Sequence, residues 1–311
     1  MIDESDFFTI CSRVTFQESL DADMLNAKLK QRFQEDGYVM LEQAIDPNTL
    51  EALLAKLDQW VDDSRAECEP YGQTIDGRPR FDIQPETHSA DNPALRRVAS
   101  PIEIDDNFLA VARDNRALDL TAELFSPNIK LYASKINLKL PGSKTTVKYH
   151  QDFNFDPHTN MDMMTVLIFL DDVTLENGPL NVVPGSHKGE LYSHWHDGVF
   201  TGAVSKEVEE ETKERAVPCI GKAGDACLMH SCVLHGSASN LTDDPRRLFI
   251  LTYVAEDAAP LVPNPIPHKY DGEIVRGKFT GNVRSEPFSL KLPEHPKTAS
   301  FFGQQEAVTG A

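Results

Sequence analysis

The tetrapeptide Tyr149-His150-Gln151-Asp152 places a histidine and a carboxylate two positions apart. On an extended strand such side chains point to the same side, so His150 and Asp152 can both reach one metal ion. His235 is the best-placed third ligand in the rest of the chain. Two imidazoles and one carboxylate on one face of an octahedral ion are typical of non-haem Fe(II) oxygenases, and they leave positions open for co-substrate and dioxygen. The sequence therefore predicts a metal site.

The residues around this tetrapeptide alternate between apolar and polar in short runs separated by turn residues, which is typical of strands. The expected strands are 38–41, 130–140, 145–149, 165–170, 180–183, 226–230 and 248–254. Apolar residues at helical spacing predict helices over 21–35, 46–60 and 109–124, with the last interrupted near residue 115. A row of strands preceded by helices predicts a mainly β fold with helical support: a double-stranded β-helix, or cupin-type jelly roll, flanked by N-terminal α-helices.

The 311 residues are expected to form a single catalytic domain, because elaborated jelly rolls reach this size as one unit. Residues 1–128 are interpreted as a mostly helical N-terminal support with a loop, and the polar segment 62–92 within them as a long surface excursion. The jelly-roll core is predicted at 129–257, with a lid-like insert at about 191–215. Residues 258–311 are interpreted as an irregular C-terminal wrap.

Composition and charge narrow the class of protein. Thirty basic against forty-nine acidic residues give a formal net charge of -19, which disfavours nucleic acid and anionic membranes as partners. None of the five cysteines lies in a C-x-x-C pair, the N-terminus lacks a signal-peptide pattern, and no apolar run is long enough to span a membrane. The sequence thus predicts a cytoplasmic protein with a small-molecule substrate and no obligatory protein partner.

Five motifs occur in a specific order after residue 128. They are KINLKLPG at 135–142, YHQD at 149–152, LENGPLNVVPGSHKG at 175–189, HGSASN at 235–240 and PRR at 245–247. Together they resemble the phytanoyl-CoA dioxygenase family of Fe(II)- and 2-oxoglutarate-dependent oxygenases. The resemblance covers roughly residues 129–257, and the segment FQEDGYV at 33–39 also fits the opening of that family.

The resemblance implies roles for individual residues. His150, Asp152 and His235 would bind iron, and Arg246 would bind the distal carboxylate of 2-oxoglutarate. Ser237 and Asn137 would also contact this co-substrate, and Leu167 stands where better-known members place a tryptophan near it. Arg247 is less suited than Arg246, because adjacent residues of a strand face opposite sides. The implied cofactors are Fe(II), 2-oxoglutarate and O2, with ascorbate as the reductant in vitro.

The function expected from these features is hydroxylation of an unactivated C–H bond of a small molecule, coupled to decarboxylation of 2-oxoglutarate to succinate and CO2. The substrate is expected to be an amino acid derivative or a specialised metabolite. The same iron centre could instead catalyse oxidative cyclisation or desaturation. A protein of another class, a non-catalytic metal-binding cupin-like sensor, would keep the ligands but would not need Arg246.

Substrate contacts are expected from residues near the metal and from the insert. Phe153 follows the aspartate of the metal site, Lys135 lies on the strand before it, and Trp195 and His196 belong to the insert. Core packing for the phenylalanine and solvent exposure for the lysine are the alternatives. The four residues are therefore predictions about the substrate pocket.

Overall fold

The larger of the two main antiparallel sheets forms the centre of the fold. The computed structural model describes residues 26–142, 144–296 and 305. The strand order in this sheet is β1-β11-β6-β13-β4-β3-β2, and β14 pairs with β4 outside that order. The bounds are β1 (Tyr38–Leu41), β2 (Phe81–Ile83), β3 (Leu95–Ala99), β4 (Ile129–Lys139), β6 (Met163–Phe169), β11 (Ala226–His230), β13 (Arg246–Ala255) and β14 (Ile274–Arg276).

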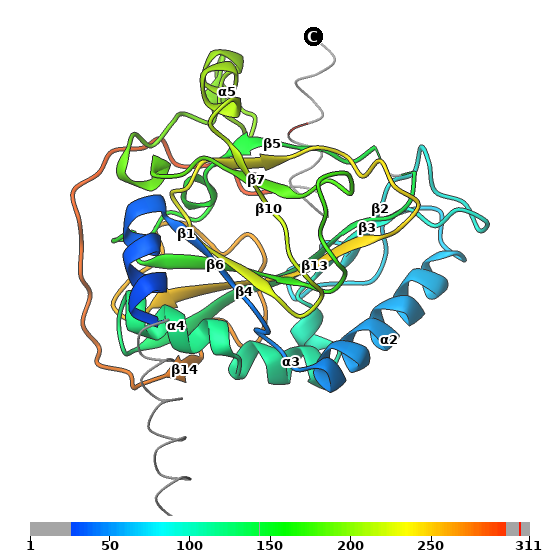
Figure 1. Ribbon diagram of the computed structural model, residues 1–311, viewed down its shortest axis with the longest axis horizontal. Coiled ribbons are helices and arrows are strands. Elements are labelled where there is room, and N and C mark those ends of the chain that lie inside the picture. The colour runs from blue at the N-terminus through cyan, green and yellow to red at the C-terminus, as the bar shows by residue number, and fades with distance from the viewer. Residues whose placement is uncertain (1–25, 143, 297–304, 306–311) are drawn as a thin grey trace, which may run out of the picture.

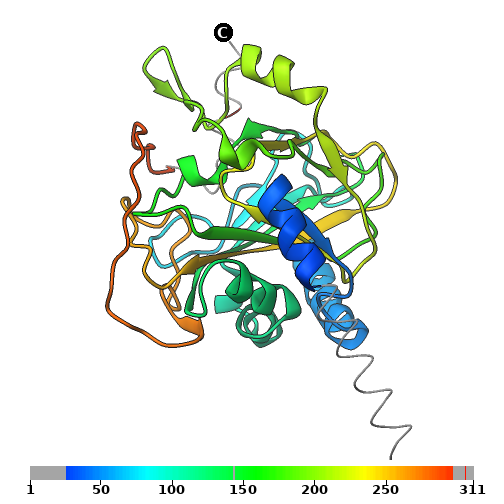
Figure 2. The same ribbon diagram turned by 60° about the vertical axis from the view of Figure 1, so that its left-hand side comes forward.

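The smaller sheet faces the larger one, and the two together make the predicted jelly roll (Figure 1). Its order is β10-β7-β12-β5. The bounds are β5 (Val147–His150), β7 (Leu180–Val182), β10 (Val217–Cys219) and β12 (His235–Ser237). The insert contains the hairpin of β8 (Trp195–His196) and β9 (Val199–Phe200), then α5 (Lys206–Lys213), and it stands out on the side of the smaller sheet (Figure 2).

Helices cover the outer face of the larger sheet, as the sequence predicts. Residues 26–36 are helical, and the first five residues of the expected helix lie outside the described residues. The others are α2 (Pro47–Ser64), α3 (Asp106–Arg113) and α4 (Arg116–Leu124). Asp46 caps α2 by accepting hydrogen bonds from two backbone N–H groups, and Asn115 caps α4, which explains the interruption there. Among the described helices, none is long and apolar enough to cross a membrane.

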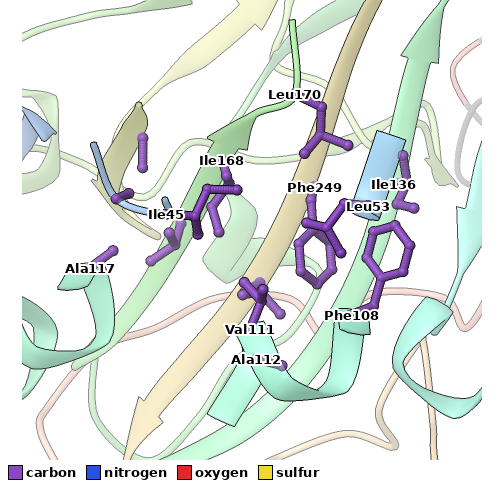
Figure 3. Close-up of a cluster of buried hydrophobic side chains, with 14 of the residues drawn as sticks. Ile45, Leu53, Phe108, Val111, Ala112, Ala117, Ile136, Ile168, Leu170 and Phe249 are labelled. Carbon is purple, nitrogen blue, oxygen red and sulfur yellow. The ribbon is translucent and has the colours of Figure 1, made fainter. Parts of the chain in front are cut away.

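The main hydrophobic core lies between these helices and the larger sheet (Figure 3). The ring of Phe108 on α3 meets the ring of Phe249 on β13 edge to face at 5.0 Å, and Leu53 of α2 is fully buried beside them. Burying a side chain of this size contributes about 1.5–3 kcal/mol. The packing makes a rigid support for the opposite face of the sheet, which carries the polar site.

Two segments differ from the sequence-based expectation. Residues 62–92, expected as a surface excursion, contain β2, which pairs with β3 and extends the larger sheet beyond β4. The alternating pattern of β2 covers only three residues, which is too short to stand out in a polar segment. In the C-terminal wrap, β14 pairs with β4, whereas residues 277–296 have no helix or strand and run along the outside (Figure 1).

Candidate active site

The two histidines of the predicted site lie opposite each other on neighbouring strands of the smaller sheet. His235 on β12 is the register partner of His150 on β5, and their ring centroids are 4.1 Å apart. The Nδ1 of His150 lies 2.8 Å from the carbonyl of Lys148, and that of His235 lies 2.9 Å from the carbonyl of Val233. A carbonyl only accepts, so each Nδ1 carries the proton and each Nε2 presents its lone pair to the site.

Asp152 completes the group. It begins the 3-10 turn η2 (Asp152–Asn154), and its Oδ1 lies 3.5 Å from Nε2 of His150 and 3.8 Å from Nε2 of His235. Thr165 on β6 donates a hydrogen bond of 2.7 Å to the other carboxylate oxygen, Oδ2, and so fixes the orientation of the group. All three ligand atoms lie within 4.8 Å of one another. The arrangement in space is the one that the sequence predicts.

The charge states of these residues suit a divalent ion. Burial acts to raise the pKa of Asp152, but the neighbouring imidazoles and Lys135 outweigh it and hold the pKa below its ordinary value. Burial, assisted by His150, lowers the pKa of His235 to about 4. At neutral pH His235 therefore offers a neutral nitrogen and Asp152 an ionised carboxylate. Two imidazoles and a carboxylate are a donor set that fits Fe(II) and leaves part of the coordination sphere to other ligands.

Two residues next to the ligands explain how this segment of sequence folds. Gln151 is fully buried and points away from the metal site. Its Nε2 donates a hydrogen bond of 2.8 Å to the carbonyl of Cys232, and its Oε1 accepts one of 2.9 Å from the N–H of Tyr192. At Gly236 an added Cβ would lie 2.9 Å from the ring of Tyr149 and 3.0 Å from the carbonyl of Val147. Glycine therefore allows β12 to approach β5 closely enough for the histidines to meet.

A first cavity extends from the metal ligands between the two sheets. It encloses about 580 Å³ of free space including its opening, and Arg246, Asn137, Ser237 and Leu167 all line it. Arg246 is buried, its Nη2 donates to the carbonyl of Gly178 at 2.8 Å, and its Nε has no hydrogen-bond partner among the described residues. Burial lowers the pKa of Arg246 to about 10, so the side chain is still a cation at neutral pH.

A second basic residue of this cavity, Lys139, was not among the predicted site residues, because exposure is the default for a lysine on a strand. It is the register partner of Arg246 across β4 and β13, and it is only 3% exposed. Its Nζ donates to Oγ of Ser237 at 2.7 Å and also contacts the carbonyl of Ala238. The signal was present in the sequence, because Lys139 lies two positions after Asn137 on the same face of β4. Its burial became evident only when the facing sheet was in place.

A second cavity reaches the metal ligands from another side. His150, Asp152 and Lys135 line it as well as the first cavity, so both cavities open on the predicted metal site. Its other lining residues among those described are Arg78, Arg97, Phe155, Asp156, Pro265, Ile266 and Pro296. It encloses about 450 Å³ of free space including its opening. Sequence reasoning did not identify its arginines.

Of the four residues predicted to contact substrate, one lies in a cavity wall. Lys135 lines both cavities, whereas Phe153, Trp195 and His196 line neither. Phe153 is fully buried against the ring of Phe288, and Trp195 donates through Nε1 to the carbonyl of Leu292. The Nε2 of His196 lies 2.9 Å from the carbonyl of Ala203. The geometry favours Lys135, and contact of the other three with substrate stays a prediction.

Arg247 faces the opposite side of β13 from Arg246, as the alternation predicts. Its Nε donates to Oδ2 of Asp171 at 2.9 Å, and its Nη1 contacts a carboxylate oxygen of Asp58 on α2. Both partners bind it on the helical side of the larger sheet. Arg247 therefore ties α2 to the sheet and does not line either cavity.

The sequence matches one protein family over most of its length. The model of the family described as "Phytanoyl-CoA dioxygenase (PhyH)" matches residues 33–248. The chain belongs to the phytanoyl-CoA dioxygenase family. This confirms the resemblance inferred from the five motifs and from the segment at 33–39, where the match begins.

Members of the phytanoyl-CoA dioxygenase family and related enzymes are similar to this chain. A probable alpha-ketoglutarate-dependent hypophosphite dioxygenase of Stutzerimonas stutzeri is 36% identical over 203 residues, which cover 64% of this chain and 71% of the relative. An L-proline trans-4-hydroxylase of Streptomyces griseoviridis is 26% identical over 283 residues, covering 79% and 97%. The crystal structure of EctD from S. alaskensis with 2-oxoglutarate and 5-hydroxyectoine superposes with a TM-score of 0.59 at 24% identity, covering 86% of each chain.

This member of the family is a non-haem Fe(II)- and 2-oxoglutarate-dependent dioxygenase. The prediction of the enzyme class and of its cofactors is thereby confirmed. When bound, Fe(II) and 2-oxoglutarate together supply the activation of dioxygen. The protein supplies the ligands, the orientation of both substrates and a site shielded from water.

Proposed function

We propose that the enzyme hydroxylates an unactivated C–H bond of a small molecule and converts 2-oxoglutarate to succinate and CO2 in the same turnover. One arrangement carries this proposal: two cavities meet at His150 and Asp152, beside His235, and one of them ends at a buried cation. A co-substrate and a substrate can therefore approach one metal ion from different sides. A sensor without turnover would need neither the second cavity nor the buried Arg246.

We assign His150, Asp152 and His235 as the metal ligands. Thr165 would hold Asp152 in one orientation, so that a single oxygen, Oδ1, faces the ion. The carbonyls of Lys148 and Val233 would keep both imidazoles in the tautomer that binds through Nε2. Because these partners are in place before any ion binds, the chain would lose little freedom on metal binding.

We assign the first cavity to 2-oxoglutarate. Arg246 would hold the distal carboxylate, with Ser237 and Lys139 beside it, since a buried guanidinium matches a carboxylate with two parallel hydrogen bonds. Asn137, whose Oδ1 has no hydrogen-bond partner among the described residues, would contact the co-substrate closer to the metal. Leu167 would pack against its carbon chain.

The relatives support hydroxylation as the reaction. The named L-proline trans-4-hydroxylase inserts oxygen into an amino acid, and 5-hydroxyectoine is bound in the related EctD structure. The second cavity of this chain, at about 450 Å³ including its opening, suits a ligand of similarly modest size. We therefore propose an amino acid derivative or another small metabolite as substrate, with residues 1–311 acting as a single catalytic domain.

A second candidate is oxidation of a P–H bond. The relative with 36% identity is named for hypophosphite, whose oxidation replaces a P–H bond by a P–OH bond. The same ligands and the same co-substrate would serve both reactions. The two candidates differ only in what the second cavity holds.

Mass spectrometry of products tests the proposal. The protein is incubated in air with Fe(II), ascorbate, 2-oxoglutarate and a panel of amino acid derivatives, with hypophosphite in a separate reaction. Hydroxylation adds one oxygen to a panel member and forms an equal amount of succinate, whereas cyclisation or desaturation removes two hydrogens. The variant Asp152→Ala is the control and should form neither product. Absence of succinate in every wild-type reaction would contradict the proposal and favour a sensor.

A further inference from the structure

The arginines in the wall of the second cavity already have partners within the fold. Arg78, at the rim, donates through Nε to Oδ2 of Asp76 at 2.8 Å. Arg97 on β3 is the register partner of Asp82 on β2, so their side chains lie on the same face of the sheet. Burial lowers the pKa of Arg97 to about 10, and Asp82 and Asp156 act in the opposite direction. The cavity therefore does not need an anionic ligand to balance its arginines.

Asp156 has a polar atom that the fold leaves without a partner. The residue comes two positions after the turn η2, which begins with the assigned metal ligand Asp152, and it lines the same cavity as Asp152 and His150. Its Oδ1 is buried and has no hydrogen-bond partner among the described residues. Burial raises the pKa of Asp156 although Lys135 and Arg97 act to lower it, so the nearby cations do not replace the missing hydrogen bond. A ligand that donates a hydrogen bond to Oδ1 would supply it.

The surroundings of Asp156 favour a donor group that is uncharged. Lys135 and Arg97 line the same wall, so they would repel an ammonium group at this place. A carboxylate has no hydrogen to donate, whereas a carboxyl oxygen accepts a hydrogen bond whether or not the group is protonated. A hydroxyl or an amide N–H is therefore the group that fits Oδ1 of Asp156.

The rest of the wall indicates the body of the ligand. Phe155, Pro265, Ile266 and Pro296 provide the apolar part of the wall. The cavity encloses about 450 Å³ of free space including its opening, which suits a small molecule. A ligand with an apolar body and one hydroxyl or amide group would match both parts of the wall.

We propose that Asp156 determines the specificity of the second cavity by accepting a hydrogen bond from a hydroxyl or amide N–H group of the substrate. The substrate class is then a small molecule that carries such a group on an apolar body. Because Asp156 and Asp152 line the same cavity, a substrate held by Asp156 presents its body towards the metal. Asp156 thereby helps to select the C–H bond that reacts. The inference rests on the proposed function, because it treats this cavity as the substrate site.

Calorimetric titration of the enzyme loaded with Fe(II) and 2-oxoglutarate, without oxygen, tests the inference. The probes have rings of similar size. Cyclopentanol and 2-pyrrolidinone carry a hydrogen-bond donor, cyclopentanone lacks one, and cyclopentylammonium and cyclopentanecarboxylate are charged. At least one of the two donors should bind about tenfold more tightly than cyclopentanone and than either charged probe, as expected for one buried hydrogen bond.

Variants of Asp156 show whether this residue causes the preference. Asp156→Leu removes the acceptor and keeps a side chain of similar size, so it should abolish the preference for the donor over cyclopentanone. Asp156→Asn keeps an acceptor oxygen and should retain part of the preference. The ratio of two affinities within one variant is the decisive quantity, because a general distortion of the cavity would weaken both probes. If Asp156→Leu does not fold, Asp156→Ala replaces it.

Asp243→Leu is the matched control. Asp243 is exposed and lines neither cavity, so this variant removes an acidic side chain outside the site. It should keep the preference of the wild type. The affinity for 2-oxoglutarate, measured for every variant, shows whether the fold and the first cavity are intact.

Binding of neither donor would overturn the inference, as would equal or tighter binding of cyclopentanone or a charged probe, or a preference that persists in Asp156→Leu. Its failure can be separated from failure of the proposed function. A donor that binds through Asp156, when no compound causes succinate formation in air, would leave the hydrogen-bonding site standing and contradict catalysis. Succinate formation that a substrate stimulates equally in the wild type and in Asp156→Leu would do the reverse.

Discussion

Lys139 and Arg246 are register partners on β4 and β13, and both side chains enter the cavity that ends at the metal ligands. The two groups are buried next to each other, burial lowers the pKa of each, and the Arg246 cation further disfavours the charged form of Lys139. Such an arrangement is unfavourable in the empty protein and becomes favourable when a dianion binds. The pair supports the proposed assignment of this cavity to a dicarboxylate, and it leads to the first two predictions.

Arg246→Ala should raise the KM for 2-oxoglutarate by about 10- to 100-fold, because a charged hydrogen bond contributes about 1.5–3 kcal/mol. The rate at saturating co-substrate should fall much less, since the residue is remote from the reacting atoms. Steady-state succinate formation over a range of 2-oxoglutarate concentrations measures both quantities. An unchanged requirement would exclude Arg246 as the carboxylate ligand, and Lys139, which lines the same cavity, would be tested next.

Lys139 should make co-substrate binding depend on pH. Burial and the neighbouring Arg246 lower the pKa of Lys139 to about 5, so the amine is neutral at pH 7 in the protein without co-substrate. A bound carboxylate favours the charged form and raises this pKa, so binding takes up a proton and becomes tighter as pH falls from about 8 towards 6. Calorimetry of 2-oxoglutarate binding in two buffers of different ionisation enthalpy measures the uptake. Lys139→Met should abolish it; uptake that persists in this variant would assign the proton to another group.

Thr165→Val should weaken metal binding by about 10- to 100-fold, the usual effect of removing a group that orients a ligand. Valine keeps the shape of threonine but cannot donate the 2.7 Å hydrogen bond to Oδ2 of Asp152. The affinity is measured by titration with Fe(II) under argon, and excess Fe(II) should restore most of the activity. Thr252→Val, on the neighbouring strand β13, is the control, because Thr252 is the register partner of Thr165 but does not line either cavity. Equal affinities of the two variants would remove Thr165 from the site.

The strands that carry the site could be predicted where the alternating pattern was long enough. The expected segment 226–230 coincides with β11, and 130–140 is displaced by one residue from β4. β12 was not predicted as a strand, because it is three residues long and includes a glycine, yet it carries His235. The motif located this residue although the local pattern could not.

The second cavity illustrates what the sequence could not reveal. Arg97 lies on β3 and Arg78 just before β2, both in a part of the chain that precedes the jelly-roll strands. No spacing rule connects them to His150, since they approach it only after β3 pairs with β4. Substrate candidates were therefore sought near the motif and in the insert. Of these, Lys135 alone lies in a cavity wall, because its strand forms the floor of both cavities.

Gly236→Ala should destabilise the fold by about 1–3 kcal/mol, the usual effect of overpacking. The added methyl group would lie 2.9 Å from the ring of Tyr149 and would separate β12 from β5. Because this separation also moves His235 away from His150, Fe(II) affinity should fall as well. Urea unfolding and metal titration measure the two effects. Gly189→Ala is the control, because an added Cβ there would lie 3.3 Å from its nearest neighbour, the carbonyl oxygen of Ser186. It should change the free energy of unfolding and the Fe(II) affinity only slightly. A stable Gly236→Ala variant with normal metal binding would show that the strands tolerate a wider spacing.

His230 should make the protein less stable at acidic pH. Burial, with a smaller contribution from His187, lowers the pKa of His230 to about 3, and its Nδ1 accepts a hydrogen bond from the N–H of Cys232. In the unfolded chain the same histidine takes up a proton near its ordinary pKa of 6.5. Between these two pKa values the unfolded state binds more protons than the folded state, so the free energy of unfolding falls as pH decreases. This residue alone lowers it by about 2–3 kcal/mol between about pH 6.5 and 4.5.

His230→Asn tests this effect, because asparagine keeps an acceptor for Cys232 but does not titrate. The variant should be less stable than the wild type at pH 7.5, since it loses the ring contacts with Phe33 and Phe125. Its free energy of unfolding should nevertheless fall less steeply between about pH 6.5 and 4.5. Urea titrations at several pH values measure both slopes. His295→Asn, at a side chain that is 44% exposed, should change the slope less, because burial lowers the pKa of this histidine less than that of His230. Parallel slopes for wild type and His230→Asn would mean that His230 is protonated in the folded protein. The acid sensitivity would then arise from other buried histidines whose pKa is lowered, such as His158 and His194.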